Sequence, residues 1–165
     1  MSNVYAARIL LPQMLRRGRG HLVSVASSNA LTTNPITMAY AATKAAQLSV
    51  AEWLAMTYGE HGIKVTCFCP KGMLTPMLLN AAEHDAYARS ALTGAVAPDE
   101  AARIMLDAVE ADRFMAITYP PIMDEFRLKA EDYEAWIAVA QRLHRDYAPA
   151  AGLPRSLTQH RYTEY

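Results

Sequence analysis

Segments rich in β-branched residues alternate with longer segments of helical periodicity along most of this chain of 165 residues. The three strand-like segments are 21–27 (HLVSVAS), 63–69 (IKVTCFC) and 113–119 (RFMAITY). At least one helix-length segment separates each of them from the next. Strands connected in this way are parallel, with helices packed on the sheet. The alternation therefore predicts an α/β fold built on a parallel sheet of about three strands.

Five helical segments are predicted around these strands, at 2–17, 38–60, 76–90, from residue 98 onward, and 122–147. Thr37 is expected to cap the second helix, and Gly62 to follow its end. After Pro149 the chain becomes polar, so residues 149–165 are expected to be a flexible tail. Residues 1–148 are then one folded unit.

Charge and cysteine content narrow the class of protein. The 16 basic and 16 acidic residues balance, which gives no electrostatic reason to expect a nucleic acid or an anionic membrane as partner. No apolar run is long enough to span a bilayer, and the histidines show no metal-ligand spacing. Cys67 and Cys69 would share one face of a strand, so we expect two reduced, buried thiols and a cytoplasmic location.

The stretch AYAATKAAQ places Tyr40 and Lys44 four residues apart at the start of the second predicted helix. Residues at this spacing lie on the same face of a helix. An ammonium group and the positive end of the helix dipole both favour the phenolate form of a tyrosine. Such a phenol can donate a proton to a carbonyl oxygen or accept one from an alcohol. The spacing alone is equally compatible with a packed ring and a solvated lysine.

The surrounding residues resemble the active-site segment of the short-chain dehydrogenase/reductase family. The segment GHLVSVASSNALTTNPITMAYAATKAA contains a serine, Ser27, thirteen residues before Tyr40, as in that family. The later segment EHGIKVTCFCPKGMLTPM resembles the next strand of the family and its nicotinamide loop. The similarity extends from residue 1 to about residue 118. It implies a partial Rossmann-like, doubly wound sheet, truncated at the N-terminus.

This resemblance implies an oxidoreductase that uses NAD or NADP and acts on a small carbonyl compound or secondary alcohol. Tyr40 would be the general acid/base, Lys44 would favour its ionisation and bind the nicotinamide ribose, and Ser27 would bind the substrate oxygen. Ser28 is the less favoured serine. The cofactor-binding residues would be Tyr40 and Lys44 with Pro70, Gly72, Met73 and Thr75. Residues 78–97 would form a substrate lid, and family members associate as dimers or tetramers.

The sequence departs from the family pattern in two ways, at residue 71 and in lacking the features of the family's first half. No G-x-G-x-x-G follows any predicted strand, so the chain lacks a visible cradle for the pyrophosphate. Lys71 stands where the family usually has glycine, and we expect a solvated side chain or a contact with a cofactor phosphate. The family's catalytic asparagine would fall just before Met1, and Asn3 is expected to lie on the surface of the first helix.

Two functions remain open on the sequence alone. The first is the catalytic half of an NAD(P)-dependent oxidoreductase. The second is an inactive truncated fragment that only associates with other subunits through its helices. Because the cofactor cradle is missing, residues 1–165 alone are expected to bind a dinucleotide weakly.

Overall fold

A three-stranded parallel sheet forms the centre of the protein, which we describe from a computed structural model for residues 2–147. Its strands are β1 (Gly20–Val25), β2 (Ile63–Cys69) and β3 (Met115–Ile117), in the order β1-β2-β3. Gly20 pairs with Ile63, and Cys67 pairs with Met115. The predicted parallel α/β fold is confirmed, although β1 and β3 are shorter than the sequence indicated. The predicted tail, residues 149–165, lies outside the described residues.

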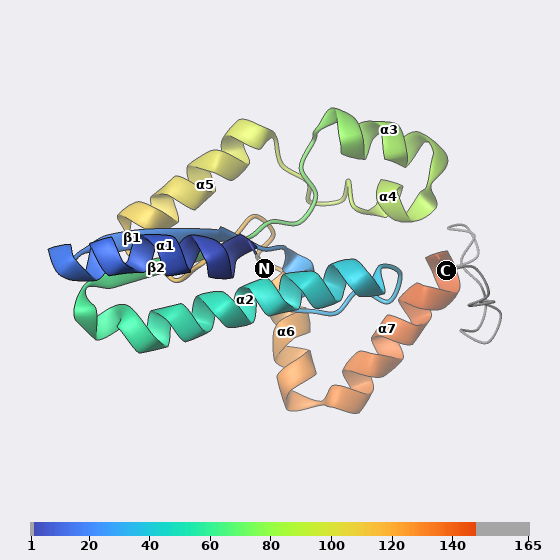
Figure 1. The fold of residues 1–165 in the computed structure, drawn as a ribbon. Helices are drawn as coiled ribbons and strands as arrows, with labels where there is room; N and C mark the ends of the chain where they lie inside the picture. Colours follow the sequence, from blue (N-terminus) through green and yellow to red (C-terminus); the bar gives the residue numbers. More distant parts are fainter. Residues whose placement is uncertain (1, 148–165) are drawn as a thin grey trace, which may run out of the picture.

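Helices cover both faces of this sheet (Figure 1). They are α1 (Ser2–Arg17), α2 (Met38–Tyr58), α3 (Pro76–His84), α4 (Ala86–Ser90), α5 (Pro98–Glu110), α6 (Ile122–Glu131) and α7 (Tyr133–Tyr147), with two short 3-10 helices, η1 (Ser28–Ala30) and η2 (Gly59–His61). Figure 1 shows α1 and α2 on the side of the sheet opposite α5. The helices α3, α4 and α7 lie toward the carboxyl ends of the strands.

The alternation of side chains along β2 explains the two layers of the core. Ile63, Val65, Cys67 and Cys69 point to one face and pack with buried residues of α1 and α2. Phe68 points to the other face and packs with buried alanines of α5. Because β2 is the central strand and is buried on both faces, its sequence is almost continuously apolar.

Two predicted helices are each divided by an aspartate. Asp85 separates α3 from α4 in an extended backbone conformation, and its Oδ1 accepts a hydrogen bond from the Ala88 N–H at 2.8 Å. Asp132 separates α6 from α7 with φ −144° and ψ 89°, and its Oδ1 accepts from the Ala135 N–H at 2.9 Å. The predictions of single helices over 76–90 and 122–147 were therefore wrong. In both places a short carboxylate side chain starts a new helix instead of continuing the old one.

Thr37 precedes α2, but its side chain does not cap the helix as predicted. Its backbone has φ −128° and ψ 69°, and its Oγ1 is buried without a hydrogen-bond partner among the described residues. The helix begins with a backbone hydrogen bond from the Ala41 N–H to the Thr37 carbonyl at 2.9 Å.

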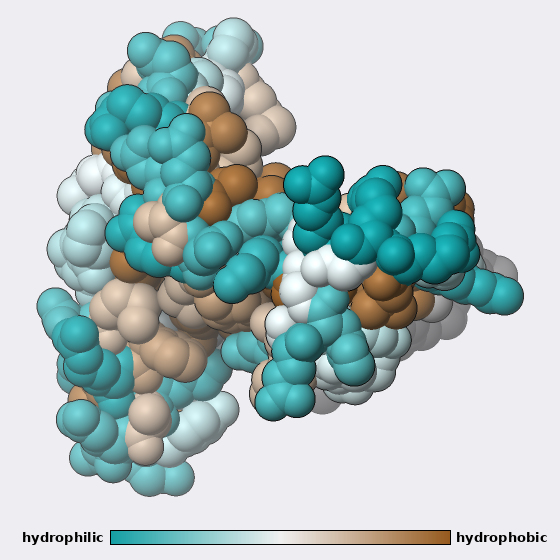
Figure 2. Space-filling model, turned by 90° about the vertical axis from the view of Figure 1, so that its left-hand side faces the viewer, coloured by the Kyte–Doolittle hydropathy of each residue, from teal (hydrophilic) through white to brown (hydrophobic). Residues whose placement is uncertain are grey.

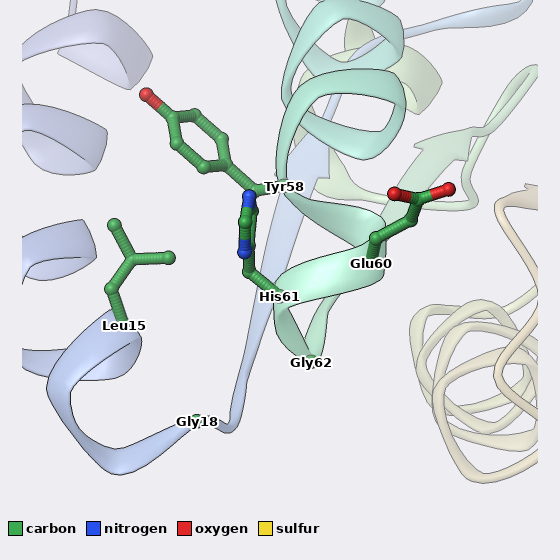
Figure 3. Close-up of a pocket in the computed structure, with 6 residues that line it drawn as sticks. All are labelled: Leu15, Gly18, Tyr58, Glu60, His61 and Gly62. Carbon is green, nitrogen blue, oxygen red and sulfur yellow. The ribbon is translucent and has the colours of Figure 1, made fainter.

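A cavity of about 730 Å³ opens at the amino end of the sheet (Figure 3). It is lined by Leu15, Gly18, Tyr58, Glu60, His61 and Gly62. In Figure 3 the Glu60 side chain points away from those of Leu15, Tyr58 and His61. None of the residues that the sequence assigned to catalysis lines this cavity.

Replacing Gly62 by alanine is expected to destabilise the fold by at least about 2 kcal/mol. Gly62 has φ +77°, and an added Cβ would lie 2.0 Å from the Gly18 carbonyl oxygen. Gly59→Ala is the matched control, since Gly59 is helical with φ −57° and has nothing within 4 Å of an added Cβ. Urea unfolding measures both variants. A Gly62→Ala protein as stable as the Gly59→Ala protein would contradict the observed turn.

The outer edge of β1 pairs with no other strand among the described residues. Val23 and Val25 on this strand are 44% and 50% exposed. Further large apolar side chains are exposed on α1 and α2: Val4, Tyr5, Ile9, Leu10, Leu15, Trp53 and Met56. Figure 2 shows one face of the molecule, on which hydrophobic residues are visible between hydrophilic ones. The sheet edge and this helical surface therefore remain uncovered in residues 2–147.

Candidate active site

Ser27 lies directly beyond the carboxyl end of β1. Its extended backbone (φ −170°, ψ 160°) caps η1, and its Oγ accepts a hydrogen bond from the Asn29 N–H at 3.2 Å. Ser27 is buried, with 6% of its surface exposed, and this hydrogen bond holds its hydroxyl in place. The next residue, Ser28, lies inside η1, and its N–H donates to the Pro70 carbonyl at 2.9 Å. That bond joins the ends of β1 and β2.

Tyr40 and Lys44 lie in the first two turns of α2, and Lys44 contacts the end of β1. The Lys44 Nζ donates to the Val25 carbonyl at 3.2 Å and lies 5.6 Å from the centre of the Tyr40 ring. The residue that accepts this bond, Val25, is the last of β1 and lies two positions before Ser27. Tyr40 is 46% exposed, and its hydroxyl has no hydrogen-bond partner among residues 2–147. A mostly fixed ammonium group therefore lies beside a phenol that is open to a ligand.

Residues 70–75 form the loop that follows β2 and precede α3. The Thr75 N–H donates to the Met73 carbonyl at 2.7 Å, and the Thr75 Oγ1 accepts from the Leu78 N–H at 3.4 Å. Gly72 is required by space, since an added Cβ would lie 2.3 Å from the Ala91 carbonyl oxygen. The loop thus lies at the carboxyl end of the sheet, as predicted, and its link to the Ser27 region is the bond between Ser28 and Pro70.

Tyr87 on α4 lies near Asn29 and Tyr40. Burial raises the pKa of Tyr87, while the nearby Asn29 side chain acts in the opposite direction and the Tyr40 phenol adds to the increase. The Tyr87 ring also packs edge-on against Tyr147 of α7, with centroids 5.9 Å apart. Tyr87 was predicted as a lid residue, but its proximity to Asn29 and Tyr40 had no signal in the sequence.

The loop between Ser27 and Tyr40 is fixed by a lysine from α6. The Lys129 Nζ donates to the Leu31 carbonyl at 3.2 Å and lies 4.8 Å from the centre of the Trp136 ring. Trp136 is buried, and its ring meets that of Tyr133 edge-to-face. The helices α6 and α7 therefore support the segment between Ser27 and Tyr40.

Asn3 and Lys71, which were discussed above as departures from the family pattern, form contacts that the sequence did not predict. Asn3 is partly buried rather than free on the helix surface, because its Nδ2 donates to the Ser24 Oγ at 2.6 Å. Lys71 is half-buried rather than fully solvated, and its Nζ donates to the Thr93 carbonyl at 2.7 Å. Both side chains fasten neighbouring segments to one another.

The two cysteines lie beneath this site on the same face of β2, as predicted. Their Sγ atoms are 3.8 Å apart, and both residues are buried. The hydrogen bond with Cys69 and burial raise the pKa of the Cys67 thiol, which stays protonated. Within residues 2–147, no cluster of three metal-ligating side chains occurs. No helix in that range is long and apolar enough to cross a membrane.

Comparison with known proteins decides the family. The sequence profile described as short chain dehydrogenase matches residues 1–86, which include Ser27, Tyr40 and Lys44. The chain belongs to the short-chain dehydrogenase family. The match covers more than half of the chain, and the segments that carry the sequence resemblance lie largely within it.

Three similar proteins illustrate the relationship within this family. The 1-deoxy-11-beta-hydroxypentalenate dehydrogenase of Streptomyces exfoliatus is 33% identical over 119 residues, which cover 68% of this chain and 40% of that relative. A short-chain dehydrogenase of Burkholderia cenocepacia, solved with NADP, has a TM-score of 0.61 at 22% identity. The match covers 84% of this chain and 51% of that structure's chain. A short-chain dehydrogenase from Burkholderia phymatum, solved with NAD, has a TM-score of 0.64 at 24% identity. That match covers 80% of this chain and 54% of the other. The two structures support the Rossmann-like fold, and this chain spans about half the length of its relatives or less.

Proposed function

We propose that this chain is the catalytic half of an NAD(P)-dependent oxidoreductase that transfers a hydride between nicotinamide and a carbonyl compound or secondary alcohol. The observation that carries the proposal is the arrangement of Lys44 between the end of β1 and the Tyr40 ring, with Ser27 two residues beyond the carbonyl that Lys44 binds. The family to which the chain belongs supplies the class of reaction.

Tyr40 is the general acid/base of the proposed reaction. Its exposed hydroxyl donates a proton to the substrate oxygen during reduction and accepts it during oxidation. The Lys44 ammonium favours the phenolate that remains after donation. Ser27 Oγ already accepts the Asn29 N–H, so its own hydrogen is free to bind the substrate oxygen as negative charge develops there.

The residues around the loop 70–75 fit the nicotinamide end of a cofactor. Gly72 leaves no room for a side chain, and Pro70 begins the loop next to Ser28. We assign the carboxamide contacts to the Met73 backbone and the Thr75 hydroxyl, and the ribose contacts to Tyr40 and Lys44. When bound, the nicotinamide supplies or accepts the hydride. This chain contains no glycine-rich loop for the pyrophosphate, so the fit extends to the nicotinamide end only.

The cofactor is NAD or NADP, since relatives of the same fold were solved with each of them. We propose a small-molecule substrate, bound between Ser27, Tyr40 and the lid formed by α3 and α4. Tyr87 gives that lid an aromatic contact near Tyr40. Neither nucleic acid nor a membrane is part of the proposal, and the reduced cysteine pair is consistent with a cytoplasmic location.

Residues 1–148 are proposed to be the carboxyl-terminal part of a single Rossmann-like domain, which forms a homo-oligomer. The exposed apolar side chains of α1 and α2 support this association, since such residues are normally covered. They also favour the second candidate function, an inactive fragment that only binds other subunits through these helices. The two candidates differ in whether Ser27 and Tyr40 affect turnover.

Single alanine substitutions at Ser27 and at Ser28 distinguish the two candidate functions. The experiment uses a chimera in which the part of the Streptomyces exfoliatus relative that precedes the aligned region is fused to residues 1–165. Ser27→Ala is expected to lower kcat by about 100- to 1000-fold, because one hydrogen bond to the developing oxyanion is lost. Ser28→Ala is the neighbouring control and should change kcat by less than about tenfold. Equal losses in the two variants would argue against the assignment of Ser27.

A further inference from the structure

We propose that Lys71 is a positioning residue that fastens the loop 70–75 to the segment 91–96, on which the lid returns to the body of the protein. The two segments then move as one unit. The inference rests on the proposed function only in that loop 70–75 is assigned there to nicotinamide binding. Its physical basis is a set of contacts around one side chain.

The backbones of the two segments lie directly against each other. Met73 and Val96 form an isolated parallel bridge, in which the Leu74 N–H donates to the Val96 carbonyl at 2.9 Å. The Val96 N–H donates to the Gly72 carbonyl at 3.2 Å. The helices α3 and α4 lie between these segments in the chain, so the lid is a closed excursion whose two ends meet at this bridge.

Lys71 adds a third segment to this junction. Its Nζ donates to the Thr93 carbonyl at 2.7 Å and lies 3.9 Å from the centre of the Tyr119 ring. The same ring covers Gly94, where an added Cβ would lie 2.3 Å from a ring carbon. The Lys71 N–H also donates to the Thr118 Oγ1 at 3.0 Å. Lys71 therefore connects loop 70–75 with the segment 91–96 and with the segment that follows β3.

The chemistry of these contacts requires a long cationic side chain. A carbonyl oxygen and the face of an aromatic ring both attract an ammonium group, and partial removal of water strengthens the second attraction. Burial lowers the pKa of Lys71, while the nearby Glu125 carboxylate acts in the opposite direction. A glycine at this position, as is usual in the family, would leave only the backbone contacts between loop and lid.

Fastening at this point has a mechanical consequence for the lid. Residues 71–75 and 91–96, the two ends of the lid, are bonded to each other. The segment 91–96 therefore cannot move away from loop 70–75 by itself. Movement is instead confined to residues between the two ends, where Asp85 divides α3 from α4. A ligand held by loop 70–75 would therefore act directly on the segment that closes the lid.

Amide hydrogen exchange of residues 1–165 tests this inference. In Lys71→Met the amides of residues 91–97 are expected to exchange about two- to fivefold faster than in the wild type. Lys71→Arg keeps the charge and the donors and should restore wild-type exchange. Lys64→Met is the matched control, because Lys64 lies on β2, the strand that precedes loop 70–75, and forms only an exposed ion pair with Asp112 at 3.5 Å. It should leave residues 91–97 unchanged.

Unchanged exchange of residues 91–97 in Lys71→Met, or equally fast exchange in Lys71→Arg, would overturn the inference. Global unfolding would appear as faster exchange in β2 as well. In that event Lys71→Gln, which retains a donor without the charge, provides the comparison, and wild-type exchange in that variant would equally overturn it. None of these measurements requires a cofactor or substrate. The inference can therefore fail while the proposed oxidoreductase function stands, and the proposed function can fail while the inference stands.

Discussion

Tyr40→Phe is expected to lower the kcat of the chimera by about 1000-fold, because the proton donor to the substrate oxygen is removed. The ring and its position beside Lys44 are retained, so the fold around it should not change. Cofactor affinity is expected to remain within about threefold, since only one hydrogen bond to the ribose is lost. Steady-state kinetics and a fluorescence titration with NADH and NADPH provide the two quantities.

Tyr58→Phe is the matched control for this experiment. Tyr58 is the last residue of α2, whose first turn contains Tyr40, and it lines the cavity at the opposite end of the sheet. With a rise of about 1.5 Å per residue, the two tyrosines lie roughly 27 Å apart along the helix. Loss of the Tyr58 hydroxyl should leave kcat unchanged. A Tyr40→Phe protein with the kcat of the Tyr58→Phe protein would show that Tyr40 is not the acid/base.

Residues 1–165 alone are expected to bind NADH at least about 100-fold more weakly than the chimera, because their sequence contains no G-x-G-x-x-G motif to hold the pyrophosphate. Loop 70–75 and Lys44 contact only the nicotinamide end in the proposed complex. Fluorescence titration of both proteins at equal concentration measures the difference, after circular dichroism has established that both are folded.

Nicotinamide mononucleotide separates the two ends of the cofactor in this comparison. It lacks the adenylate half, so it should bind the 165-residue chain and the chimera with similar, weak affinity. Dinucleotide affinity in the short chain equal to that in the chimera would contradict the conclusion that the nicotinamide end is the only part that fits. It would also point to a pyrophosphate site that the sequence pattern missed.

Features that depend on spacing along the chain were predictable from the sequence. The positions of the three strands follow from their β-branched runs, and the shared face of Tyr40 and Lys44 follows from their separation by one helical turn. The position of Ser27 at the end of β1 follows from the same order of elements. Each of these predictions uses residues that are close in sequence or on adjoining strands.

Features that depend on distant partners could not be predicted. Lys71 and the Thr93 carbonyl are 22 residues apart, and no local pattern links them. The same holds for Lys129 and the Leu31 carbonyl, which are 98 residues apart. The breaks at Asp85 and Asp132 were missed for a different reason. An aspartate is acceptable on a helix surface, and only its hydrogen bond to a later N–H shows that it begins a new helix.

Hydride transfer itself tests the central claim most directly. The chimera is incubated with NADH or NADPH that carries deuterium at the transferable position, together with a panel of ketones, and the products are analysed by mass spectrometry. We predict an alcohol with deuterium on the carbinol carbon, formed by the wild-type chimera and by Tyr58→Phe but about 1000-fold more slowly by Tyr40→Phe. A cofactor-binding chimera that yields no deuterated alcohol from any ketone, or a Tyr40→Phe variant that forms it at the wild-type rate, would contradict the account.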